Sequence, residues 1–197
     1  ASLYEDQKKF TKAEKLYKQA LKILRNNHIL ANKDVTAIFH NLAGLYSEQG
    51  AYEKAAQIYY EVSVLNRKNY GDKHPKSAVT LNNWALTLLA QKKYRQAEAK
   101  FEQALKILTD SHGTNHYSTA NCLYNYGKLS FETGNYSKAE NQFKSALKTK
   151  RELLGETHSE VVDILKKLAE LYRVIMKDDE AEAIEKNIAT IQKRISQ

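Results

Sequence analysis

The chain has 197 residues, of which 42% are apolar, and its formal net charge is +8 at pH 7. A single cysteine, Cys122, excludes a disulfide framework and a thiolate metal cage, and one proline with seven glycines argues for helices rather than a β-sandwich or disorder. No apolar run approaches the roughly 18 residues that a membrane span needs, and the N-terminus carries no charged-then-apolar signal segment. We therefore expect an all-α chain in the cytoplasm. Because it starts without Met inside a helical pattern, we also expect a fragment, from which a targeting segment could have been cut away.

Taken in chain order, the helical patterns form a partial unit over 1–26 and four complete units near 33–69, 75–111, 117–153 and 159–196. Each complete unit holds two helical segments, and the first of them carries apolar residues at i, i+3, i+4 and i+7, the spacing that places them on one face of a helix. Short links such as GAY and TGN join the two helices of a unit, with glycine supplying a sharp stop. The sequence therefore predicts one domain over the whole chain, residues 1–197, built as a single array of helix pairs.

An internal period of 42 residues supports this division. One alanine recurs at that interval in the second helix of each unit, at Ala13, Ala55, Ala97, Ala139 and Ala181. Four residues later an aromatic recurs, at Tyr17, Tyr59, Phe101 and Phe143, before Glu185 breaks the series. Small residues let two helix backbones approach, and we expect the aromatic ring to fill the space between neighbouring helix pairs. The last second helix carries a stripe of isoleucines instead, which is typical of a capping helix or of one that covers a following segment.

The links between units share a histidine and read GDKHP at 71–75, GTNHY at 113–117 and GETHS at 155–159. The order of small and large residues resembles the tetratricopeptide repeat, a helix-turn-helix unit of usually 34 residues. The 42-residue version, with these links and NNLA-like first helices, is similar to the kinesin light chain type. The resemblance covers nearly the whole chain and implies an α-solenoid, a right-handed superhelix of stacked antiparallel helix pairs. It implies a binding role without saying which one.

The stretch LNNWAL, residues 81–86, places two asparagines in an otherwise apolar helix, although asparagine is a mediocre helix former. Asn41, Asn83 and Asn125 occupy the same place in successive units. In the expected architecture the first helices line a concave surface. At about 100° per residue, Asn82 and Asn83 are predicted to turn away from the core toward that surface.

An amide side chain offers donors and an acceptor together, as an extended peptide main chain requires. In tetratricopeptide proteins the residue corresponding to Asn83 commonly touches bound peptide, and the resemblance implies that role for Asn41, Asn83 and Asn125. The neighbours expected in the same groove are His40, Asn82, Tyr124, Leu86, Lys128 and Phe131. Lys167 departs from the ladder, and either offers a charge to an acidic ligand residue or marks the end of the site. The alternative is that the asparagines only bond neighbouring helices and fix the stacking of the repeats.

The positive charge invites a nucleic-acid interpretation, but its distribution argues against one. The four first helices are each close to neutral, whereas the excess lies on second helices, above all at 8–25. That segment carries Lys8, Lys9, Lys12, Lys15, Lys18, Lys22 and Arg25 against one acidic residue, Glu14. A charged convex face of this kind is typical of a solvated surface.

No Gly-rich phosphate loop, HExxH or Gly-x-Ser-x-Gly motif occurs in the sequence, so we expect neither an enzyme nor a cofactor. His74, His116 and His158 are one repeat apart, too far to share a metal ion bound at about 2.0–2.1 Å, so we expect them to serve the links.

The leading interpretation is a protein–protein interaction scaffold or adaptor that binds a peptide segment of a partner in its concave groove. The alternatives are a self-associating structural repeat module, and binding of nucleic acid or an anionic surface through the basic helix 8–25.

Overall fold

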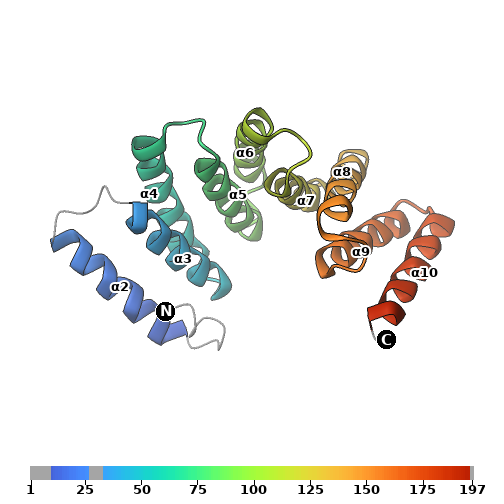
Figure 1. Ribbon diagram of the computed structural model, residues 1–197, viewed down its shortest axis with the longest axis horizontal. Helices are drawn as coiled ribbons and strands as arrows, with labels where there is room; N and C mark the ends of the chain where they lie inside the picture. The colour runs from blue at the N-terminus through green and yellow to red at the C-terminus, as the bar shows by residue number, and fades with distance from the viewer. Residues whose placement is uncertain (1–9, 27–32, 196–197) are drawn as a thin grey trace. The chain divides into compact units, whose positions relative to one another are not determined.

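A computed structural model describes residues 10–26 and 33–195 of the chain. Within these ranges the chain forms α-helices joined by short links, and no strand. In chain order the helices are α2 (Phe10–Asn26), α3 (Lys33–Glu48), α4 (Tyr52–Tyr70), α5 (Pro75–Ala90), α6 (Tyr94–His112), α7 (Tyr117–Glu132), α8 (Tyr136–Leu154), α9 (Ser159–Val174) and α10 (Asp178–Ile195), as Figure 1 shows. The expected all-α fold is confirmed, although residues 1–9 of the expected partial unit and residue 196 of the last unit lie outside the described residues.

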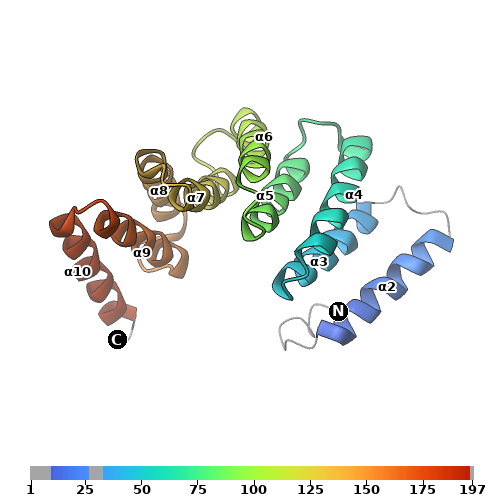
Figure 2. The same ribbon diagram turned by 180° about the vertical axis from the view of Figure 1, so that it is seen from behind.

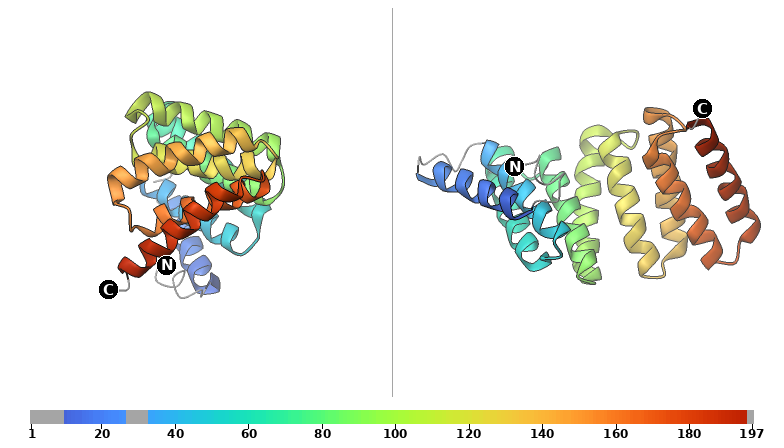
Figure 3. Two further views of the ribbon diagram at one scale, coloured as in Figure 1. Left: turned by 90° about the vertical axis from the view of Figure 1, so that its right-hand side faces the viewer. Right: turned by 90° about the horizontal axis from the view of Figure 1, so that it is seen from below.

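The helices pack into two compact units, residues 1–107 and 108–197, with the division inside α6. In the first unit α3 contacts α2, α4 and α5; in the second, α8 contacts α7 and α9, and α9 contacts α10 (Figures 2 and 3). From α3 to α10, links of three or four residues join consecutive helices, so packed neighbours in this part of the chain run antiparallel. We call α3, α5, α7 and α9 the first helices of the repeats, and α2, α4, α6, α8 and α10 the second helices.

The recurring alanine and aromatic positions form the core, as the period predicts. The fully or almost fully buried members are Tyr17, Ala55, Tyr59, Ala97, Phe101, Ala139, Phe143 and Ala181. In the first unit, Tyr17, Ala55 and Tyr59 join a cluster with buried side chains of α3, such as Phe39 and Leu42. In the second unit, Ala139, Phe143 and Ala181 join side chains of α9 and α10, such as Leu168 and Ile188. Because helices cannot approach closely over large side chains, the alanine at the crossing is what brings an aromatic ring of the second helix against the first helix.

Gly127 marks the tightest of these crossings. It stands in α7 where the equivalent residues are Ala43, Ala85 and Ala169. A Cβ atom added at Gly127 would lie 2.5 Å from the ring of Phe143, which is too close for two carbon atoms. The missing side chain of Gly127 therefore makes room for the ring of the facing helix.

The three link histidines cap the first helices that follow them. The Nδ1 atom of His74 accepts a hydrogen bond from the backbone N–H of Lys76 at 3.1 Å, and His116 accepts one from Ser118 at 3.1 Å. His158 repeats this contact with Glu160 at 3.3 Å. The first N–H groups of a helix have no partner inside it, so an acceptor here stabilises the helix start. In the links, these histidines therefore act as N-caps of the helices that follow them.

The turns between first and second helices place one residue in the left-handed region. Gly50 and Gly134 have φ angles of 73° and 76°, as the predicted glycine stops require. At the same place in the other two repeats stand Lys92 (φ 58°) and Met176 (φ 57°). The turn geometry therefore persists where the sequence lacks glycine.

One position near the end of the second helix carries a different residue in α4, α6 and α8, although it is buried in all three. Asn66, Leu108 and Lys150 are spaced by 42 residues, and each is no more than 2% exposed. Lys150 bonds Glu160 at the start of α9 and reaches Asn121 Oδ1 at 3.3 Å. Burial raises the pKa of Glu160, but the hydrogen bonds from Lys150 and Tyr117 outweigh it and hold that pKa below its usual value. The Lys150 charge is thereby compensated inside the stack.

The two helical glycines outside the turns provide a matched test of the close crossing. Gly127→Ala should destabilise the chain by about 1–3 kcal/mol, because the added methyl meets Phe143 and overpacks the crossing. Gly44→Ala should instead stabilise it by about 0.5–1 kcal/mol, because its nearest neighbour, the Tyr59 hydroxyl, is 3.9 Å away and alanine favours the helix. Urea unfolding followed by circular dichroism measures both values. Equal effects of the two substitutions would contradict this account.

The capping role predicts a selective response at His116. His116→Ala should lower the free energy of unfolding by about 1 kcal/mol, because the Ser118 N–H loses its acceptor. His116→Asn should retain most of the stability, since an Asn side chain accepts the same bond. The exposed linker variant Thr114→Ala is the control, and should leave stability within about 0.5 kcal/mol of the wild type. If His116→Asn lost as much stability as His116→Ala, the imidazole ring itself, and not the hydrogen bond to the Ser118 N–H, would be what stabilises the link.

Candidate peptide-binding groove

A stripe of accessible residues runs along the first helices of the first unit. Such residues recur at i, i+4, i+7 and i+11, the repeat of one helix face. We call the accessible stripe the residues Ala37, Asn41, Gly44 and Glu48 of α3, and Val79, Asn83, Leu86 and Ala90 of α5. Most of it is small, apolar or amide-bearing, and only Glu48 is charged. This surface can contact an extended chain through both main-chain hydrogen bonds and apolar side chains.

Asn83 connects the two helices that carry the stripe. Its Nδ2 atom lies 2.9 Å from His40 Nε2, and its Oδ1 accepts a bond from Asn82 at 3.0 Å. Burial lowers the pKa of His40, which favours the neutral ring that accepts a hydrogen bond at Nε2. The His40 ring in turn meets the ring of Tyr59 edge-on, with centroids 5.6 Å apart. Asn83 is half-buried, so it holds α3 and α5 together while part of it remains accessible.

The hydroxyl of Tyr59 closes this cluster from the second helix. Burial raises the pKa of Tyr59 to about 12, against hydrogen bonds from Asn83 and Ser47 that lower it. The phenol therefore stays protonated at neutral pH. Together these polar groups give the wall beneath the accessible stripe a fixed arrangement.

Two of the predicted groove residues are buried, and the predicted orientation is wrong for them. Asn82 and Asn125 are each 5% exposed. Asn82 continues the buried row Ala78, Ala85 and Leu89, with helical spacings of four, three and four. In α7, Asn125 likewise falls in line with the buried residues Cys122 and Leu129. Of the three asparagines in the predicted ladder, Asn41 alone is fully exposed and Asn83 partly so.

The remaining predicted residues lie half-buried on their helices. Leu86 belongs to the accessible stripe of α5, whereas Tyr124, Lys128 and Phe131 lie on α7 of the second unit. Lys128 Nζ lies 5.1 Å from the centroid of the Tyr124 ring. Burial lowers the pKa of Lys128, helped by the like charge of Lys167. Phe131 packs on the core of the second unit instead of standing free.

The first helices of the second unit present a different surface. On α9 the accessible positions carry Asp163, Lys167 and Glu170, and Lys167 pairs with Glu170 at 2.6 Å. The pattern-based prediction omitted Val79, Ala37 and Glu48 of the first unit. The 42-residue period could have identified Ala37 and Val79. They are equivalent positions, and each lies four residues before an asparagine, Asn41 or Asn83.

Two features of the described residues bear on catalysis, the metal-binding side chains and the cysteine. Among these residues, no group of three His, Cys, Asp or Glu side chains is placed to bind a metal ion. Burial raises the pKa of Cys122 to about 12, so its thiol is not a nucleophile at neutral pH. None of the described helices is long and apolar enough to cross a membrane.

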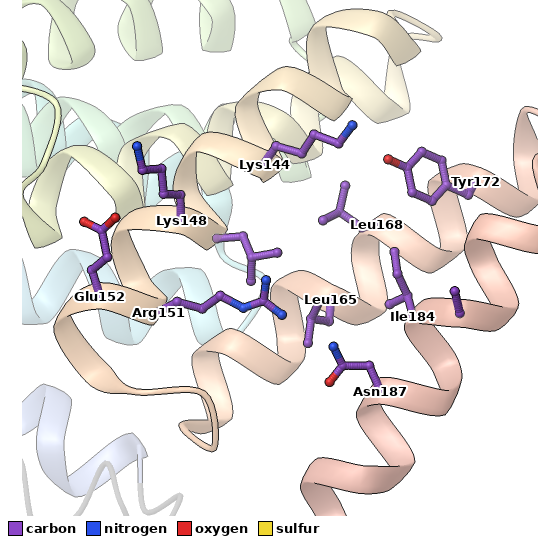
Figure 4. Close-up of a pocket in the computed structure, with 11 residues that line it drawn as sticks. Lys144, Lys148, Arg151, Glu152, Leu165, Leu168, Tyr172, Ile184 and Asn187 are labelled. Carbon is purple, nitrogen blue, oxygen red and sulfur yellow. The ribbon is translucent and has the colours of Figure 1, made fainter.

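A depression in the second unit lies outside the accessible stripe. It has a volume of about 620 Å³ and lies among α8, α9 and α10 (Figure 4). Leucines of α8 and α9 and Ile184 form its floor, with Lys144, Lys148 and Arg151 along one side. Leu168 stands in this floor where the equivalent residue of α5 is Trp84. Two of the cations already have acidic partners, Lys144 with Glu140 and Arg151 with Glu156.

Comparisons with known proteins identify the repeat. The tetratricopeptide repeat family model matches residues 1–63, 34–110 and 76–152. The chain is similar to the crystal structure of BtubC (BKLC) from P. vanneervenii, with 24% identity and a TM-score of 0.85, over 99% of this chain and 78% of that one. It is also similar to a Podosopora anserina putative kinesin light chain with nearly identical TPR-like repeats (18% identity, TM-score 0.80, covering 100% and 93%) and to MamA (16% identity, TM-score 0.67, covering 98% and 94%). A search of curated proteins finds no match.

The likeness to these structures concerns the fold, whereas the family model covers most of the sequence. Repeats of this family generally mediate protein–protein interactions, and proteins built from them are typically non-enzymatic scaffolds. The fold of its repeats is similar to that of the kinesin light chain repeats, and the chain belongs to the tetratricopeptide repeat family.

Proposed function

We propose that this chain is a protein–protein interaction scaffold that holds a peptide segment of a partner along its first helices. The observation that carries the proposal is the accessible stripe of α3 and α5, which combines amide groups with small and apolar residues and has a single charge. Second helices, by contrast, carry many exposed lysines, such as Lys106 and Lys148. A nearly neutral strip beside charged surfaces suits a peptide whose main chain and apolar side chains make the contacts.

Asn41 is the main-chain anchor in this proposal. Its side chain is exposed, so its amide donors and its acceptor are within reach of an extended peptide. Asn83 adds a second amide, fixed in position by His40 and Asn82, so little side-chain freedom is lost when a ligand binds. Val79 and Leu86 offer apolar contact beside these amides.

The first helices of the second unit offer different chemistry. Tyr124 and Lys128 are half-buried on α7, and the Lys128 ammonium lies against the Tyr124 ring. They offer an aromatic face and a positive charge where the first unit offers amides. Asn125 and Asn82 serve the packing of their helices, and Phe131 serves the core, so their substitution would alter the fold before it altered binding.

Peptides selected from a random library against the intact chain provide the probe for a photo-cross-linking test. A photoreactive phenylalanine analogue replaces Val79 of the accessible stripe or, as a matched control, Val64 of α4. These valines are 42% and 49% exposed, so they differ in location rather than accessibility. We expect the selected peptides to cross-link at position 79 and not at position 64. Cross-linking at position 64 with none at position 79 would overturn the proposal.

The amide anchor has its own test with the same peptides. Asn41→Ala should weaken binding about five- to tenfold, because one hydrogen bond to the peptide is worth about 1 kcal/mol. Gln57→Ala, which removes an exposed amide from the second helix α4, should leave the dissociation constant unchanged. Titration calorimetry measures both, and circular dichroism verifies that the variants are folded. Equal affinity of Asn41→Ala and wild type would remove Asn41 from the site.

A further inference from the structure

A cavity of about 250 Å³ opens beside the accessible stripe of the first unit. It lies among α3, α4 and α5, and its mouth includes the exposed residues Asn41 and Val79. Apolar groups of Val62 and Val79 line part of its wall. Its volume exceeds that of a single amino-acid side chain, so a side chain of a docked peptide can enter it.

Two buried polar atoms in the cavity wall lack partners. Asn66 is 2% exposed, and its Nδ2 donates to Thr80 Oγ1 at 2.9 Å and to the Lys76 carbonyl at 3.3 Å. Its Oδ1 accepts no hydrogen bond from the part of the chain that the structure describes. The hydroxyl of Thr36, a residue 7% exposed, is also unpaired among those residues. A buried polar group without a hydrogen-bond partner destabilises the chain, so each of these atoms favours a ligand that supplies the missing bond.

The equivalent place in the second unit is filled by the chain itself. Lys150, the counterpart of Asn66, extends its ammonium to Asn121 and Glu160, the counterparts of Ala37 and Lys76. The ammonium lies 5.0 Å from the centroid of the Tyr117 ring. A flexible chain that ends in a hydrogen-bond donor therefore occupies this place when the residue is long enough. Asn66 is shorter than lysine, and its Oδ1 is buried without a hydrogen-bond partner among the described residues.

The charge at the mouth differs between the two units. Lys76 stands where the second unit has Glu160, and its Nζ donates to Tyr70 Oη at 3.3 Å. Within residues 10–26 and 33–195 it has no acidic partner. An entering cation would therefore meet a like charge, unlike the Lys150 ammonium beside Glu160. The cavity favours a neutral donor.

We propose that this cavity is a subsite for the primary carboxamide side chain, glutamine or asparagine, of a peptide bound along the accessible stripe. The amide NH₂ donates to Asn66 Oδ1, and the amide carbonyl accepts from the Thr36 hydroxyl. The aliphatic stem lies against Val62 and Val79. The inference rests on the proposed function, since the side chain belongs to the docked peptide.

Propionamide, the analogue of a glutamine side chain, is the probe for the chemistry of the cavity. We expect it to cause saturable chemical-shift changes at the methyl groups of Thr36 and Val62 in NMR titrations of the intact chain. The comparison ligands are 2-butanone, propionate and butylammonium, which lack the neutral NH₂ group. They should bind about tenfold more weakly, as expected for a lost hydrogen bond or, for butylammonium, repulsion by Lys76. Equal binding of propionamide and 2-butanone would overturn the inference.

The double variant Asn66→Lys/Lys76→Glu reproduces the arrangement of Lys150 and Glu160 and should fill the cavity. We expect it to lose the propionamide response at Thr36 and Val62. The matched control Gln57→Lys/Lys54→Glu makes the same kind of charge exchange at exposed positions of α4 and should keep that response. Should the double variant unfold, Thr36→Val serves instead, because it removes only the hydroxyl and should weaken propionamide binding several-fold. Retained binding in the folded double variant, or in Thr36→Val, would count against the subsite.

The selected peptides separate the two proposals. If they cross-link at position 79 while propionamide leaves Thr36 and Val62 unchanged, the groove stands and the carboxamide subsite fails. If propionamide binds but the peptides do not cross-link at position 79, the proposed function fails, and with it the assignment to a peptide side chain. Enrichment of glutamine or asparagine in the selected peptides, lost when selection is repeated on the double variant, would support both.

Discussion

The fit of an aromatic ring against a small residue at each helix crossing is the constraint on which this structure depends. Phe143 lies fully buried against Gly127, closer than any side chain at position 127 would allow. Burial of one such ring contributes about 1.5–3 kcal/mol, and the rings of Tyr59 and Phe101 are buried as well. Because this packing uses the inner faces of both helices of a pair, the outer face of each first helix is free to carry other chemistry.

Polar contacts add to this packing, but they do not set the distances between the helices. Histidine caps define where the first helices begin, and the Lys150–Glu160 pair joins the end of one repeat to the start of the next. The contact between Asn83 and His40 likewise joins α3 to α5, at the accessible stripe. The same amide can therefore support the wall and remain partly available on its surface, so the structural and ligand-binding interpretations of Asn83 are compatible.

Sequence reasoning succeeded where a feature follows from periodicity and failed where it depends on a particular neighbour. The 42-residue spacing predicted the buried alanines and aromatics because steric fit repeats with the backbone. The orientation of Asn82 and Asn125 was missed because an angle of about 100° per residue does not say how wide the buried face is. In α5 that face is wide enough to include Asn82, which is 5% exposed. Lys150 was also missed, because lysine is seldom buried and its partners lie on other helices.

The position shared by Asn66, Leu108 and Lys150 has a consequence for how such arrays diversify. An amide, a hydrocarbon and an ammonium all occupy it, while the surrounding alanine and aromatic frame stays the same. After duplication, a change at one or two codons can therefore turn a closed contact between two repeats into an open, selective one. No new fold has to evolve. Innovation in this lineage would then be concentrated at the borders between repeats, where natural selection can try new specificities at small cost to folding.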